Sequence, residues 1–384
     1  MLVATEASGD LIGAELARAL RERLGPDGIR LVGVGGARMA AEGMLSPFPI
    51  ADLSIVGVFD GLPALPRIHR RVGQTVELAR RERPDAAVLI DSWGFSVRLA
   101  SRLRRLRPRP TLIKYVLPQA WASRPWRARG VARLFDRLLA INTFDAPLYE
   151  HQGAALTFVG NPALARDFSR ADGARLRAKI GAASSDPLLL LLPGSRASEV
   201  ERLMGPFEGA VEILRLGRPN LKVVIAAAPS VAQEVRALNA RWRRPAQLVE
   251  GDEARFDAMA GATAAIACSG TVTTELAMAG CPMIVAYKLG VFSYPVARLL
   301  ITTPWITLIN IAAAAPVVPE LVQGDCTPGA LAREIAPLLD DEALRSARVA
   351  SQNDAVEKLR GGILDPIGAA ADAVIDVLKE IRSN

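Results

Sequence analysis

Short apolar runs alternate with amphipathic segments along most of the chain, and this alternation limits the fold more than any other feature. The predominantly apolar runs of the first half occupy 29–32, 86–90, 112–116, 138–141 and 157–159. The same rhythm restarts in the second half, with runs at 187–192, 221–227, 247–249, 264–267 and 283–287. Strands that are apolar on both faces and separated by helices belong to parallel sheets with covered faces. The sequence therefore predicts an α/β protein with two Rossmann-like halves.

The length of the chain supports a division into two domains. A single hydrophobic core stops growing at roughly 250–300 residues, whereas this chain has 384. We expect a first domain at 1–163, a second at 174–345, and C-terminal helices at 346–384 that pack back on the first domain. The first predicted strand, at Leu2–Ala4, is short, and we therefore expect the native start to lie upstream.

Several protein classes are disfavoured by composition. No stretch of about 18 apolar residues occurs, so we expect no transmembrane helix. The N-terminus lacks the basic and apolar regions of a secretory signal. Three cysteines, Cys268, Cys281 and Cys326, have neither zinc-site nor disulfide spacing. These features predict a cytoplasmic protein without a metal or another cofactor.

Positive charge is concentrated in one part of the chain. Between Arg67 and Arg137 there are eighteen Lys and Arg residues against five Asp and Glu residues. Such a face suits phosphates, either of nucleic acid or of an anionic membrane leaflet; a solvated arginine-rich surface is the third interpretation. No nucleic-acid-binding module is recognisable and aromatic residues make up 5% of the chain, which is unfavourable for base stacking. We therefore expect a membrane surface rather than nucleic acid as the partner.

Two candidate motifs follow strands in the first half, where open α/β sheets bind their ligands. Glu6-Ala7-Ser8-Gly9-Asp10 leads from the first strand into a helix, and its small residues allow close approach of a ligand. Asp91 follows the apolar run 86–90 and is flanked by aromatic residues, an environment that suits a general base. For Ser8, Asp10 and Asp91, helix capping is the alternative interpretation.

Two further motifs follow strands in the second half. Leu192-Pro193-Gly194-Ser195-Arg196 offers turn N–H groups and a guanidinium that could bind a diphosphate. The stretch 268–275 places Ser269, Gly270 and Thr271 at a helix start as a second phosphate cradle, with Glu275 one turn later as a ligand for ribose hydroxyls. Ordinary helix capping again remains the alternative.

Together these motifs resemble those of the lipid-A-disaccharide synthase family over nearly the whole chain. The matching segments are E-A-S-G-D at 6–10, G-x-G-G-x-x-M at 33–39, A-E-G at 41–43, V-G-V at 56–58, I-D at 90–91, W-A at 121–122, L-L-P-G-S-R at 191–196, S-G-T-x-x-x-E at 269–275, C-P-M-I-V at 281–285, Tyr287, Asn310 and P-E-L-V-Q at 319–323. The resemblance implies a GT-B fold, in which two Rossmann-like domains face a central cleft. It also implies inverting transfer from UDP-2,3-diacylglucosamine to 2,3-diacylglucosamine-1-phosphate at the cytoplasmic face of the inner membrane. A homodimer is a further possibility.

The resemblance and the motifs together assign the site residues. We expect Asp91 as the base, with Glu6 and Asp10 positioning the acceptor or supporting the developing cation. The expected donor residues are Gly194, Ser195, Arg196, Ser269, Gly270, Thr271, Glu275, Asn310, Glu320 and Gln323. The expected acceptor, acyl-chain or membrane-facing residues are Ser8, Gly9, Val58, Phe59, Leu62, Leu65 and Ile68. The last five form an apolar stripe if their segment is helical; packing of that stripe into the core is the alternative.

Some positions depart from the family pattern, mainly on the acceptor side. Trp93 and Ser96 replace a proline and an asparagine, Gln119 replaces a serine, and Asn161 replaces a histidine. A changed acceptor or reduced activity is therefore one alternative. Others are a UDP-sugar 2-epimerase or related GT-B enzyme, and an inactive scaffold that binds a UDP-sugar.

Overall fold

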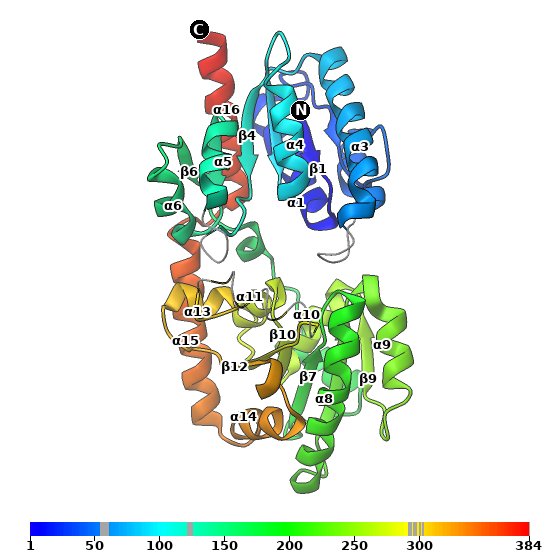
Figure 1. Cartoon of the computed structure of the whole chain (residues 1–384). Helices are drawn as coiled ribbons and strands as arrows, with labels where there is room; N and C mark the ends of the chain where they lie inside the picture. Colours follow the sequence, from blue (N-terminus) through cyan, green and yellow to red (C-terminus); the bar gives the residue numbers. More distant parts are fainter. Residues whose placement is uncertain are drawn as a thin grey trace. The chain divides into compact units, whose positions relative to one another are not determined.

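A computed structural model describes residues 1–53, 61–120, 126–290, 294, 298, 301 and 303–383; the side chains of 52 and 61–64 are outside this description. The chain forms two compact units (Figure 1). The first unit contains Met1–Pro162 and Arg360–Asn384, and the second contains Ala163–Leu359. No helix among the described residues has the length and apolarity needed to cross a membrane.

The first unit is built on a six-stranded parallel sheet of order β2-β1-β3-β4-β5-β6. Its strands are β1 (Leu2–Ala4), β2 (Gly33–Val34), β3 (Ala86–Ile90), β4 (Thr111–Tyr115), β5 (Arg137–Ala140) and β6 (Leu156–Phe158). The strand predicted at 29–32 is displaced to β2, although the Val32 carbonyl still accepts a bond from the Leu2 N–H (2.9 Å). The chain runs from β1 to β2 on one side and then crosses to β3 on the other. The point where the strand order reverses therefore lies between β1 and β3.

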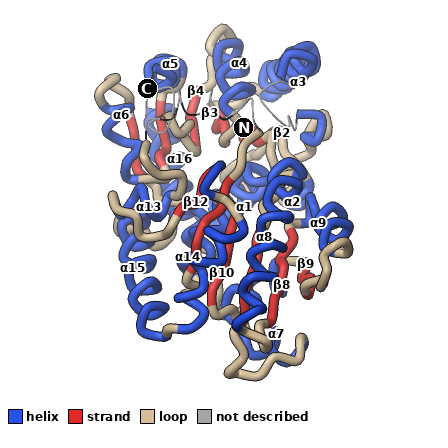
Figure 2. The backbone as a smooth tube through the Cα atoms, turned by 60° about the horizontal axis from the view of Figure 1, so that its bottom comes forward, coloured by secondary structure: helices blue, strands red, loops and turns tan. Residues whose placement is uncertain are grey.

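Helices cover both faces of this sheet, because alternate strand residues are apolar on each side. One face carries α3 (Gly61–Glu82), α4 (Trp93–Leu103), α5 (Trp126–Leu134) and α6 (Ala146–Glu150). The other carries α1 (Ala7–Leu24), α2 (Ala37–Ala41) and α16 (Pro366–Ser383). Figure 2 shows these helices lying against the strands.

The second unit repeats the architecture with the strand order β12-β11-β10-β7-β8-β9. Its strands are β7 (Leu188–Leu192), β8 (Lys222–Ala227), β9 (Gln247–Glu250), β10 (Ala264–Cys268), β11 (Met283–Tyr287) and β12 (Glu320–Val322). Its helices are α7 (Gly173–Lys179), α8 (Ala197–Gly217), α9 (Ala232–Asn239), α10 (Asp252–Gly261), α11 (Thr271–Met278), α13 (Leu308–Ala313), α14 (Pro328–Asp340) and α15 (Glu342–Arg360). This is the Rossmann strand order, and its reversal lies between β7 and β10.

The C-terminal helices divide between the units at Arg360, not at the predicted residue 346. Helix α16 packs on α1 through buried residues such as Ala371 and Val374. Helix α15 belongs to the second unit because its buried Gln352 bridges the start of β11. The amide of Gln352 accepts a bond from the Met283 N–H (3.2 Å) and donates to the Cys281 carbonyl (3.0 Å).

Lys114 interrupts the apolar character of β4. Its side chain is 1% exposed, on the sheet face that carries α3 and α4. Burial lowers the pKa of the Lys114 ammonium from 10.5 to about 7, and the nearby carboxylates of Asp91 and Glu6 oppose this shift. A buried lysine destabilises the fold to the extent that folding favours its neutral form.

This burial predicts a pH-dependent difference in stability between the wild type and Lys114→Met. Below pH 7 the ammonium is charged in both folded and unfolded states, so the full penalty is present; above pH 10.5 the penalty is gone. One unit of pKa shift corresponds to about 1.4 kcal/mol. The free energy of unfolding of the wild type, relative to the variant, should therefore rise by a few kcal/mol as pH increases across this window. Urea denaturation of both proteins measures it, and a constant difference would contradict the prediction.

Candidate functional site

The predicted motifs lie at the two reversal points of strand order. In the first unit, 6–10 follows β1 and Asp91 follows β3, and these strands are direct neighbours. In the second, 193–196 follows β7 and 269–271 follows β10, again on neighbouring strands. Because parallel strands share one carboxyl edge, each pair of motifs meets at one end of its sheet.

Gly9 allows the first motif to pack tightly against both strands. A Cβ atom on Gly9 would lie 3.3 Å from the Ala4 Cβ and 3.7 Å from Cγ2 of Ile90. The start of α1 therefore fits closely over the ends of β1 and β3. Glu6 and Ser8, by contrast, are exposed at this edge.

Asp10 is buried and its carboxylate is used within the unit. It accepts hydrogen bonds from the N–H groups of Gly36 (2.7 Å), Arg38 (3.0 Å) and Met39 (3.1 Å), at the start of α2. A side chain on Gly36 would collide with the Asp10 carboxylate, since its Cβ would lie 2.6 Å from an oxygen. The geometry therefore supports the capping interpretation for Asp10, although the helix it caps is α2 rather than its own.

Asp91 differs from Asp10 because its carboxylate is available. It is half-buried, and no donor within the described ranges is hydrogen-bonded to its side-chain oxygens. Its main chain is instead firmly held: its N–H donates to the Tyr115 carbonyl (3.0 Å), and its carbonyl accepts from Oγ of Ser96 (2.9 Å) and from Lys114. Asp91 and Ser92 both have left-handed backbones, with φ of 52° and 39°. A free carboxylate on a fixed turn is suited to accept a proton.

The turn at 193–196 is organised by Glu199, which sequence reasoning did not single out. The buried Glu199 carboxylate accepts bonds from the N–H groups of Ser195 (3.1 Å) and Arg196 (3.3 Å), and from the Arg196 guanidinium (2.8 Å). Gly194 has a φ of 110°, and a Cβ there would lie 2.5 Å from a Glu199 oxygen. These contacts use the turn N–H groups that we expected to bind phosphate. The Arg196 side chain remains 66% exposed and can reach an anion.

The second loop, 269–271, leaves the start of α11 open. Gly270 and Thr271 are exposed, and the hydroxyl of Ser269 donates to the Ile306 carbonyl (3.1 Å). The Thr273 hydroxyl donates to the Gly270 carbonyl (2.8 Å), which fixes the loop against its helix. Exposed N–H groups at a helix start are suited to bind an anion.

Glu275 lies away from this open end. Its side chain is 4% exposed and pairs with Nε of Arg166 (3.1 Å) and with the Arg255 guanidinium (3.6 Å). The Glu275 carboxylate is therefore already paired with arginines in this structure and does not stand ready for the expected contact with ribose hydroxyls. The two arginines stand far from Glu275 in sequence, so the pattern S-G-T-x-x-x-E could not reveal them.

Asn310, Glu320 and Gln323 are also engaged within the second unit. The Glu320 carboxylate accepts bonds from the N–H groups of Ile306 and Thr307 (both 2.9 Å) and from the buried Asn310 amide (2.8 Å). Gln323 accepts a bond from the Leu289 N–H (2.6 Å). Glu320, with Asn310, holds the segment that contains Ile306 and, through it, Ser269. The assignment of all three side chains as direct donor contacts stays a prediction.

The predicted apolar stripe is only partly within the described residues. Val58, Phe59 and the side chain of Leu62 lie outside them. Leu65 is half-buried. Ile68, also in α3, is 7% exposed and packs in the core between this helix and the sheet. Ile68 is therefore not part of a membrane-facing surface, because the helical turn directs it at the sheet. The core alternative is correct for this residue.

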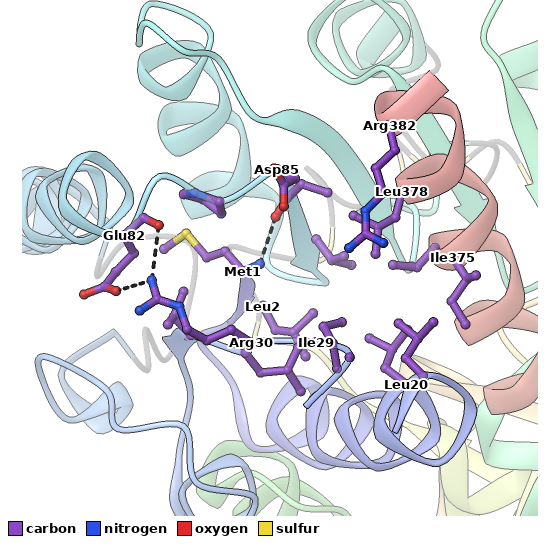
Figure 3. A pocket seen from close by; sticks show the side chains of 18 of the residues that line it. Met1, Leu2, Leu20, Ile29, Arg30, Glu82, Asp85, Ile375, Leu378 and Arg382 are labelled. Atoms are coloured by element: carbon purple, nitrogen blue, oxygen red, sulfur yellow. Dashed lines mark hydrogen bonds and ion pairs between the residues drawn. The ribbon is translucent and has the colours of Figure 1, made fainter. Parts of the chain in front are cut away.

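Each unit also contains a cavity. One of about 390 Å³ lies at the amino ends of the first sheet, opposite Asp91; Figure 3 shows apolar side chains such as Leu20 and Ile375 beside the Arg30–Glu82 ion pair (2.6 Å). The other, of about 500 Å³, lies in the second unit beside Tyr287 and Ile306. Among the described residues, no group of acidic, histidine or cysteine side chains is placed to hold a metal ion.

Comparison with known proteins agrees with this arrangement. The family described as lipid-A-disaccharide synthetase matches residues 1–373. Lipid-A-disaccharide synthases of Rhodospirillum centenum and Paramagnetospirillum magneticum are each 41% identical to the chain; the matches cover 98% and 99% of it, and 94% and 97% of those proteins.

Solved structures establish the fold. The MnaA–UDP structure of S. aureus matches with a TM-score of 0.66 at 13% identity, covering 99% of this chain and 95% of that one. MurG of Acinetobacter baumannii matches with a TM-score of 0.55 at 15% identity, covering 98% of each chain. The two Rossmann-like units thus form the GT-B fold that we predicted. The chain belongs to the lipid-A-disaccharide synthase family, whose members are glycosyltransferases of lipid A biosynthesis.

Proposed function

We propose that this chain transfers 2,3-diacylglucosamine from UDP-2,3-diacylglucosamine to 2,3-diacylglucosamine-1-phosphate, with inversion at the anomeric carbon. Beyond family membership, one observation carries the proposal. Asp91 presents a half-buried carboxylate, free of hydrogen bonds from the described donors, at the strand-order reversal of the first unit. An acceptor hydroxyl needs such a base, because the alcohol is a weak nucleophile until its proton is removed.

The reaction is a single displacement. Asp91 takes the proton of the acceptor hydroxyl as that oxygen bonds to the anomeric carbon of the donor. The bond from this carbon to the diphosphate breaks, and its electron pair leaves on UDP. The exposed Arg196 guanidinium and the open start of α11 neutralise the charge that develops on the diphosphate. Glu6, exposed after the neighbouring strand β1, orients the acceptor or supports the positive charge on the sugar.

The assignment of Asp91 as the base predicts a specific loss of turnover. Asp91→Asn keeps the size of the side chain and removes its basicity, so it should lower turnover about 10²-fold or more. Its affinity for UDP should not change, because the nucleotide-binding loops belong to the second unit. Purified wild type and variant are incubated with both lipid substrates, and the disaccharide 1-phosphate and released UDP are quantified.

The result separates several outcomes. Failure of the wild type to form any disaccharide would refute the proposed reaction, and epimerisation of a UDP-sugar without an acceptor would favour the 2-epimerase alternative. Asp10→Asn serves as the matched carboxylate control and should act through stability. If a folded Asp10→Asn abolishes turnover while Asp91→Asn keeps it, the two roles must be exchanged.

The next prediction concerns the donor. Removing one hydrogen bond to a charged group costs about 1.5–3 kcal/mol, so Arg196→Ala should weaken UDP binding roughly tenfold or more. Arg236→Ala removes another exposed arginine of the second unit and should leave affinity unchanged. Calorimetric titration with UDP compares the three proteins. Equal affinity in a folded Arg196→Ala would remove Arg196 from the donor site.

Access to lipid substrates is explained by peripheral binding to an anionic membrane at the cytoplasmic face. Arg67 and Arg70 lie in the first half of α3, are exposed, and belong to the stretch 67–137 in which positive charge is concentrated. Their position supports this proposal. Each basic residue near an anionic leaflet contributes around 1 kcal/mol, and salt screens this attraction. The apolar residues that precede these arginines would add a component that salt does not remove.

Sedimentation with anionic liposomes tests this membrane contact. Phe59→Ser/Leu62→Ser/Leu65→Ser should bind less than wild type, most clearly at high salt. The matched control replaces three leucines that are 82–88% exposed elsewhere, as Leu45→Ser/Leu216→Ser/Leu364→Ser, and should bind like wild type. Equal binding by both folded triple variants at low and high salt would exclude the stripe from the membrane contact.

A further inference from the structure

We propose that Lys114 is a positioning residue for the transfer, whose buried side chain holds the left-handed turn at Asp91 and Ser92 and thereby fixes the Asp91 carboxylate. The inference rests on the proposed role of Asp91 and extends it to a residue with no direct access to substrate. Its side chain is 1% exposed and lies beneath the edge of the sheet.

Several acceptors from neighbouring elements converge on this side chain. Nζ of Lys114 donates to the Leu89 carbonyl (3.2 Å) and to the Asp91 carbonyl, both at the end of β3. It also lies 3.5 Å from the Tyr115 carbonyl, at the end of its own strand, and 3.4 Å from Oγ of Ser96 in α4. One ammonium group therefore ties the ends of two strands to the following helix.

The backbone at this point needs such support. Asp91, Ser92 and Val116 all have positive φ values, of 52°, 39° and 60°, directly after β3 and β4. A left-handed backbone is strained in residues other than glycine and persists only where surrounding contacts enforce it. Nζ of Lys114 donates to the Asp91 carbonyl. It also lies near the carbonyl of Tyr115, the residue that precedes Val116. It is therefore placed to enforce both turns.

An apolar residue would fill the same place without the cost of burying an amine. Lysine is rarely fully buried, and the surrounding sheet face is formed by residues such as Leu89 and Leu112. The charged groups that act on Lys114 are the carboxylates of Asp91 and Glu6, both on the proposed acceptor side. A lysine in this position therefore serves the turn and its carboxylate rather than the packing of the sheet.

A double-mutant cycle between Lys114 and Asp91 tests the proposal on the full chain. Lys114→Met should lower kcat roughly tenfold or more, since small displacements of a reacting group cost up to about 10²-fold. KM for the UDP-linked donor and the affinity for UDP should stay as in wild type. In the Asp91→Asn background the same substitution should change kcat by less than about twofold, because residues that act through one another are not additive.

Controls keep the test decisive. Thr75→Val changes another fully buried polar residue of this unit and should leave kcat unchanged. If Lys114→Met does not fold, Ser96→Ala, which removes a donor to the same Asp91 carbonyl, replaces it in the cycle. A folded variant with normal kcat, or a loss that adds fully to that of Asp91→Asn, would overturn the proposal. Normal turnover of Asp91→Asn would instead refute the base assignment, and absence of product from wild type would refute the proposed function.

Discussion

The parallel arrangement of both sheets is the constraint on which the rest of the structure depends. All strands of one sheet end at the same edge, and loops diverge there only where the strand order reverses. That point lies between β1 and β3 in the first unit and between β7 and β10 in the second. The four motifs at 6–10, at Asp91, at 193–196 and at 269–271 each follow one of these four strands. The topology therefore decides where the chemistry occurs before any side chain is considered.

Carboxylates that bond to the main chain then fix the loops at these edges; those of Asp10 and Glu199 are buried, and that of Glu320 is partly buried. Asp10 holds the start of α2, Glu199 holds the turn at 193–196, and Glu320 holds the segment beside Ser269. Each accepts main-chain N–H groups that would otherwise be unsatisfied, which makes the loops rigid. Asp91 is held through its backbone by Lys114 and keeps its carboxylate available. The contrast between occupied and available carboxylates distinguishes residues that organise the site from the one proposed to react.

The sequence predicted the two sheets and the positions of the motifs, because continuous apolar runs and turn residues are local signals. It did not predict which polar groups are already paired. Asp10 and Glu275 look like ligands in their motifs, but their partners at 36–39 and at Arg166 and Arg255 become neighbours only after folding. Ile68 was assigned to an acceptor-, acyl-chain- or membrane-facing stripe from helical spacing and the family resemblance, and neither tells which side of a helix meets the sheet. Lys114 did leave a signal, as a charge inside the apolar run 112–116.

The proposed reaction is a single displacement, with a base at one strand-order reversal and the leaving group held at the other. The configuration of the new glycosidic bond tests it most directly, since one attack from the opposite side inverts the anomeric carbon of the donor. The disaccharide formed by the purified protein from the α-linked UDP donor should be isolated and its anomeric coupling measured by NMR. A single displacement predicts the β configuration throughout the product. An α-linked disaccharide would contradict it, because retention requires either two displacements or attack from the side of the leaving group.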